Sequence, residues 1–156
     1  MIGQVIQILT SRGQSLTDAI RNNVVKVTGK TAQSLGYEVI SDRTSATLRI
    51  TAKPYFRVVE TGRKPTPGKK PSRAMIENIG EWLEALGKEQ KLAWAIATSI
   101  NKKGTKLWQQ GGREDVFSNV LSDRAISKLE RDVFDIIADD VLQEFLKDLK
   151  RNQLIN

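Results

Sequence analysis

The 156-residue chain carries a net charge of +7, with 39% apolar and 28% charged residues, which is typical of a globular protein with a modest core. It has no cysteine and no histidine, so disulfides and thiolate chemistry are excluded, and the commonest metal ligand is missing. No apolar run approaches the roughly 20 residues that cross a bilayer, so we expect no membrane contact. We expect a single intracellular domain over residues 1–156 that is not an enzyme.

Apolar residues at steps of three or four predict an amphipathic helix from Ser15 to Leu35, and Ser15 is its expected cap. The residues on its apolar face are Leu16, Ile20, Val24, Val27 and Thr31. The preceding Ile2–Leu9 segment is apolar enough for a short helix or a strand, and its pattern favours neither.

A β-hairpin is predicted over residues 37–52. Apolar residues alternate with polar ones over residues 45–52, which is typical of a half-buried strand, and Tyr37–Ser41 is the expected partner strand. Residues 42–44 are suited to the turn. Pro54 then ends the second strand and starts a short helix, Tyr55–Thr61, which Gly62 terminates.

Three further helices are predicted, at Ala74–Leu86, Leu92–Asn101 and Ser122–Lys150. Helical spacing favours the core for Trp82 and Trp94, whereas Trp108 stands in a polar, glycine-flanked segment where an exposed aromatic fits a protein contact. The fold class is therefore α+β, a small antiparallel sheet packed by an N-terminal helix and several C-terminal helices.

The last predicted helix has an apolar face wider than a single stripe, because Phe134, Ala138, Leu142 and Leu146 extend it. Two interpretations remain open. Either its own domain covers the helix on two sides, or one flank packs on a neighbouring subunit. On the second interpretation Phe134, Leu142 and Leu146, together with Trp108, are candidate oligomer contacts.

Most of the positive charge lies in residues 53–73, which hold seven cations and one carboxylate. The loop after Gly62 contains three prolines, which restrict its backbone before any partner binds. Its cations are Arg63, Lys64, Lys69, Lys70 and Arg73. We expect these side chains to face acidic protein or DNA, and a merely solvated loop is the alternative. Glu60 and Gly62 are predicted to anchor the loop, with Glu60 accepting from Arg63 or from a neighbouring cation.

No catalytic constellation is found in the sequence. Neither glycine-rich phosphate-binding motif occurs, and no histidine is available to activate a serine. Asp132, Asp135 and Asp139 share one helix face and can in principle hold a divalent cation. Lys128 and Arg131 beside them favour ordinary ion pairs, so no metal, cofactor or catalytic site is expected.

The segment Tyr55–Leu83 contains an ordered set of short motifs, and Lys103–Gly104–Thr105 follows downstream. The matching positions are Tyr55, Val59, Glu60, Gly62, Arg63, Pro65, Gly68, Pro71, Ile76, Trp82 and Leu83. In this order they resemble the neck proteins of tailed bacteriophages, the head–tail joining or tail-completion family. The resemblance covers roughly residues 37–121, and the helices at both ends agree with it in order.

The resemblance implies a structural virion protein, made in the host cytoplasm, that forms a homo-oligomeric ring of roughly six or twelve copies. Such a ring joins the portal or adaptor of the head to the tail, and genomic DNA passes through it. The alternative is a basic DNA- or RNA-binding module of a mobile element, for which the concentrated positive charge is the motivation.

Overall fold

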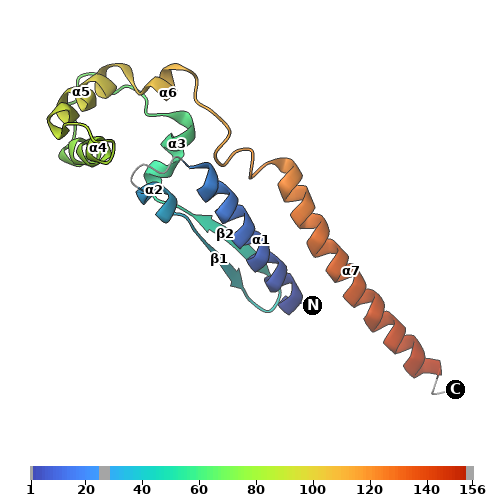
Figure 1. The fold of residues 1–156 in the computed structure, drawn as a ribbon. Coiled ribbons are helices and arrows are strands. Elements are labelled where there is room, and N and C mark those ends of the chain that lie inside the picture. The colour runs from blue at the N-terminus through green and yellow to red at the C-terminus, as the bar shows by residue number, and fades with distance from the viewer. Residues whose placement is uncertain (1, 25–28, 154–156) are drawn as a thin grey trace. The chain divides into compact units, whose positions relative to one another are not determined.

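The computed structural model describes residues 2–24 and 29–153 and confirms an α+β fold. Figure 1 shows a two-stranded antiparallel sheet, an N-terminal helix and a long last helix. The elements are α1 (Ile2–Asn23), α2 (Lys30–Gln33), β1 (Gly36–Ser41), β2 (Ala46–Thr51), α3 (Val58–Thr61), α4 (Arg73–Ala85), α5 (Ala93–Lys103), α6 (Lys106–Gln109) and α7 (Asp123–Gln153), with 3₁₀ turns at Pro54–Arg57 and Gln90–Leu92. Within these described ranges, no helix combines the length and the apolarity needed to cross a bilayer.

The chain divides into two compact units, each assembled from separate segments. The described parts of unit 1 are residues 2–18, 37–51 and 121–153, which hold most of α1, the hairpin and α7. Unit 2 comprises the described parts of residues 19–36 and residues 52–120, with α2 to α6. Nothing in this division tests the prediction of a single domain, which stays a prediction.

Unit 1 contains the hairpin, whose predicted position and turn are confirmed. The Asp42 carboxylate closes the turn by accepting from the backbone N–H groups of Thr44 at 2.7 Å and Ser45 at 2.8 Å. The Thr44 backbone N–H, followed by the Ser45 hydroxyl, lowers the pKa of Asp42 to about 2. Helix α1 packs on the hairpin through Gly13, where an added Cβ would lie 2.7 Å from a Leu48 methyl group.

The prediction for the first helix was wrong at both ends. Helix α1 begins at Ile2, so Ser15 lies within it and caps nothing, and it ends at Asn23. Its buried face is continuous, at Val5, Leu9, Gly13, Thr17, Ile20 and Val24. Gly13 and Thr17 interrupt the apolar spacing from which a buried helix face is predicted. Gly13 is nevertheless buried, because the missing side chain lets α1 approach the hairpin closely. Gly29 has a left-handed backbone (φ 75°), so the predicted run to Leu35 is broken, and Val27 lies outside the described residues.

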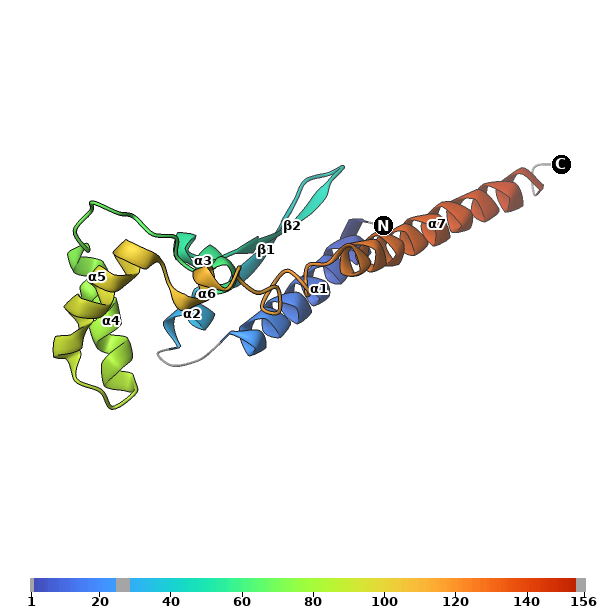
Figure 2. The same cartoon turned by 90° about the horizontal axis from the view of Figure 1, so that it is seen from above.

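Unit 2 contains a helical pair, α4 and α5, shown in Figure 2. The positions of both helices were predicted, but the burial of Trp82 and Trp94 was predicted wrongly. The residues buried are Met75, Gly80 and Leu83 in α4 and Ala93, Ala97 and Asn101 in α5. Because the two helices approach through these mostly small residues, the bulky indoles are excluded, and Trp82 and Trp94 are 40% and 61% exposed instead of lying in the core.

Helix α7 confirms the long last helix of the sequence, beginning at Asp123 and running 31 residues. Within unit 1 it is tied to α1 by an ion pair in which the Arg12 guanidinium donates to the Asp132 carboxylate, with Nε at 3.0 Å. Ile136, on the same side as Asp132, is partly buried, whereas every residue from Val141 to Lys150 is exposed. The part of α7 around Asp132 and Ile136 is therefore partly covered by its own unit, whereas residues 141–150 are exposed on every side.

Candidate functional site

The short helix α3 places Glu60 inside unit 2. Pro54 at the first position of the preceding 3₁₀ turn and Gly62 at the end of α3 set its limits, as predicted. Phe56 is buried beside the core residues Ile20, Val24 and Val116. One helical turn later the Glu60 side chain enters the same interior, where it is only 3% exposed.

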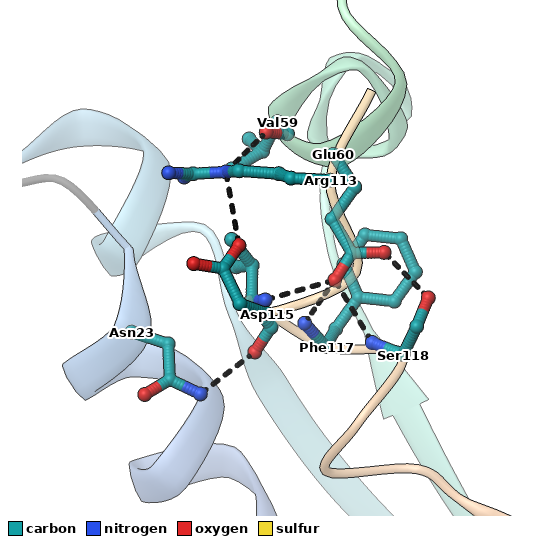
Figure 3. A network of polar contacts seen from close by, with 8 residues as sticks. Asn23, Val59, Glu60, Arg113, Asp115, Phe117 and Ser118 are labelled. Carbon is teal, nitrogen blue, oxygen red and sulfur yellow. Dashed lines mark hydrogen bonds and ion pairs between the residues drawn. The ribbon is translucent and has the colours of Figure 1, made fainter. Parts of the chain in front are cut away.

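The Glu60 carboxylate receives three consecutive backbone N–H groups (Figure 3). Its Oε1 accepts from Val116 at 2.9 Å, Phe117 at 2.6 Å and Ser118 at 2.9 Å, and its Oε2 accepts from the Ser118 hydroxyl. The backbone oxygen of Glu60 accepts from the Arg113 N–H at 2.9 Å. An irregular segment with no helix or strand of its own is thereby fixed in place over residues 113–118, which we call the clasped segment.

The pKa of Glu60 lies below its usual value of 4.5 as a balance of opposing causes. Burial of the carboxylate raises the pKa. The Ser118 hydroxyl and the three backbone N–H groups lower it, and their sum exceeds the effect of burial. The carboxylate is therefore ionised at neutral pH, and its charge is stabilised by hydrogen bonds from neutral donors.

The predicted role of Glu60 needs correction, because its carboxylate accepts hydrogen bonds from Val116, Phe117 and Ser118 and not from Arg63. It holds the clasped segment, not the proline-rich loop. Two residues that sequence reasoning missed hold the loop instead. The Thr105 hydroxyl accepts from Arg63 N–H at 3.0 Å, and the buried Asn101 amide donates to the Lys69 backbone oxygen at 3.0 Å.

The proline-rich loop is fastened to the end of α5 by backbone hydrogen bonds as well. Thr66 N–H donates to Asn101 O at 2.8 Å, and Thr105 N–H donates to Arg63 O at 2.9 Å. At the far end Ser72 caps α4 by accepting from Met75 N–H at 3.2 Å. The loop is thus held at both ends and in the middle, and this geometry presents its side chains on a fixed backbone.

Gly62 and Gly68 allow a matched test of this attachment, since both have positive φ angles of 69° and 80°. A Cβ at Gly62 would meet the Trp108 backbone and lie 2.7 Å from the Thr105 hydroxyl, whereas a Cβ at Gly68 would meet nothing within 4 Å. We expect Gly62→Ala to lower the free energy of unfolding by about 3 kcal/mol and Gly68→Ala by about 1 kcal/mol, measured by urea denaturation. Equal losses would contradict the close approach at Gly62.

The loop and the end of α5 combine into one strongly basic region. Residues 61–76 hold five cations and no carboxylate, and residues 90–113 likewise hold five cations and no carboxylate. Among the ion pairs between described residues, Arg73 pairs with Glu77 of its own helix at 2.8 Å, and none involves Arg63, Lys64, Lys69 or Lys70. We define the basic surface as Arg63, Lys64, Lys69, Lys70, Lys102, Lys103 and Lys106. All are exposed except Arg63, which is half-buried.

Two exposed tryptophans accompany these cations. Trp94 lies on α5, where Lys102 is eight residues further on and about 80° around the helix, so both belong to one side. Trp108 is 43% exposed on α6, two residues after Lys106, as its glycine-flanked setting suggested. The contribution of α5 and α6 was missed in the sequence, although the absence of carboxylates from residues 90–113 was a signal for it.

Unit 1 carries a second unusual surface, on α7. Phe134, Val141, Leu142 and Phe145, which we call the α7 stripe, are 67%, 58%, 52% and 59% exposed. Leu146 beside it is 40% exposed. At 100° per residue Phe134, Val141 and Phe145 fall within about 40° of one another, opposite the face that holds Asp132. This leaves an apolar face of α7 without a described partner.

Carboxylates border the α7 stripe on both sides. Asp135 lies along one edge and Glu144 along the other, about 100° and 80° around the helix from Phe134, and both are exposed; Asp139 lies about 140° from Phe134, beside Asp132. No lysine or arginine occurs between Arg131 and Lys147. In residues 2–24 and 29–153 no cluster of three metal-ligating side chains forms, and Asp132 is engaged by Arg12. Asp135 and Glu144 thus form an acidic rim beside the α7 stripe.

Comparison with known proteins adds no relative, since no family model, no curated protein and no solved structure matches the chain.

Proposed function

We propose that this chain is a non-enzymatic structural subunit that assembles into a ring at the neck of a tailed-phage virion, joining the portal or adaptor to the tail. The observation that carries the proposal is the α7 stripe, four large apolar side chains that are each more than half exposed. Such a surface is costly in a monomer and is typical of an assembly interface. The resemblance of residues 55–83 to phage neck proteins supports the ring.

The rigid basic surface fits the same role. A loop whose backbone is already fastened loses little further freedom when it binds, so its cations can meet acidic protein or passing DNA at low entropic cost. A second candidate function, a nucleic-acid-binding module, is favoured by two sequence stretches that each hold five cations and no carboxylate.

The solution mass of the purified chain tests the proposal. We expect sedimentation velocity to give a closed oligomer whose population grows with protein concentration, and we expect co-purification with portal or tail proteins from virions. A monomer at every concentration, and also in virions, would contradict the ring. A monomer whose affinity for duplex DNA falls with salt by a log–log slope of about −0.9 per phosphate contact would support the second candidate instead.

A further inference from the structure

We propose that the α7 stripe and its acidic rim bind the basic surface of a second copy of this chain, in a head-to-tail contact. This inference rests on the proposed ring, and it names the two surfaces that meet in it. Asp135 and Glu144 of one copy face the lysines of the next, and Phe134 and Phe145 pack against its exposed tryptophans.

Charge complementarity selects a second copy as the occupant. The rim belongs to a stretch, residues 132–146, with five carboxylates and no cation, while the basic surface comes from two stretches with no carboxylate at all. Two surfaces of opposite charge attract each other, whereas two copies of the same charged surface repel each other. The acidic rim of α7 is therefore unsuited to pair with the acidic rim of another α7. One chain carries both halves of the complementary pair.

The apolar parts match as well as the charges. From Phe134 to Phe145 the stripe extends about 16 Å at 1.5 Å per residue, and α5, with 11 residues, has about the same length. Trp94 on α5 and Trp108 on α6 are the exposed aromatics beside the lysines. Aromatic anchors surrounded by charged side chains are typical of the energetically important centre of an interface.

A contact between two different surfaces propagates. Each copy offers its α7 to one neighbour and its basic surface to the other, so repeating the contact closes a ring when the rotation between copies divides a full turn. A contact of this kind needs no further protein to define its symmetry.

Charge reversal in two separate variants tests the pairing. The first variant carries Asp135→Lys and Glu144→Lys, and the second carries Lys102→Glu and Lys103→Glu. All four side chains are exposed, so both variants are expected to keep the wild-type circular dichroism and urea midpoint. We expect each variant alone to associate roughly 100-fold more weakly than the wild type, because like charges then face each other.

Mixing distinguishes a contact between copies from a contact within one chain. We expect an equimolar mixture of the two variants, and the chain with all four substitutions, to recover the wild-type oligomer in sedimentation velocity. Recovery in the four-substitution chain without recovery on mixing would show that α7 binds its own chain, and would overturn the inference. Variants that assemble like the wild type, or that are rescued in neither way, would overturn it too.

The outcome for the ring itself is separate. A wild-type chain that assembles regardless of these charges keeps the ring proposal while the pairing fails. A closed two-fold dimer with rescue on mixing would support the pairing and overturn the ring.

Discussion

Replacing Glu60 with alanine is expected to lower the free energy of unfolding by about 4 kcal/mol, a large part of the 5–15 kcal/mol typical of a domain. The substitution leaves the N–H groups of Val116, Phe117 and Ser118 without their acceptor, and Val116 is fully buried. An unsatisfied buried donor costs about 1–3 kcal/mol, and water can compensate partly at the two more exposed positions. Urea denaturation measures the loss.

The matched variant Glu60→Gln keeps an acceptor oxygen and the side-chain length. We expect it to cost only about 1–2 kcal/mol, since a neutral oxygen accepts the three N–H groups more weakly than a carboxylate does. Similar losses in Glu60→Ala and Glu60→Gln would mean that side-chain volume, and not the acceptor, matters at this position.

The same residue predicts a dependence of stability on pH. Because the folded pKa of Glu60 lies below its unfolded value, ionised Glu60 stabilises the fold above the unfolded pKa, and that contribution is lost as pH falls through the folded pKa. We expect the wild type to lose stability more steeply than Glu60→Gln below about pH 4.3, the unfolded value for glutamate. Parallel pH profiles for the two proteins would contradict the lowered pKa.

The double variant Phe134→Gln/Phe145→Gln is expected to weaken self-association by roughly 100-fold or more. Burial of a phenylalanine side chain contributes about 1.5–3 kcal/mol, and every 1.4 kcal/mol changes an equilibrium constant tenfold. Because both rings are exposed in the chain by itself, we expect little change in the urea midpoint. Sedimentation velocity over a range of concentrations measures the effect.

Two controls accompany this variant. Phe134→Leu/Phe145→Leu keeps both positions apolar and is expected to assemble within about tenfold of the wild type. Gln143→Ala changes an exposed residue on the opposite side of α7 and is expected to have no effect. Assembly of the glutamine variant at the wild-type level would show that the α7 stripe is not an interface.

Where neighbouring residues control the structure, the sequence was a good guide. The hairpin, the short helix between Pro54 and Gly62, and the limits of α4 all follow from local properties: strand alternation, the fixed φ of proline and the positive φ of glycine. The exposed setting of Trp108 also followed from its glycine-flanked segment.

Burial was less predictable. In α5 the bulky apolar residues Ile96 and Ile100 are only partly buried, and the buried residues are Ala93, Ala97 and Asn101, about 100° further around the helix. Trp94, near the edge of this buried face, is 61% exposed. Hydrophobic spacing identifies a helix, but packing against α4 decides which face of α5 is buried. The face with the small residues Ala93 and Ala97 is the buried one, because it allows the two helices to approach more closely.

Local pattern and composition therefore determine the α+β class, the limits of most elements and the concentration of charge in residues 53–73, because each depends on residues close together in the chain. Contacts between distant segments determine the rest. Glu60 meets its donors 56 to 58 residues away, and Arg63 is held by Thr105, 42 residues away. A single carboxylate in sequence shows no partner, since its neighbours in space are set only when the chain packs.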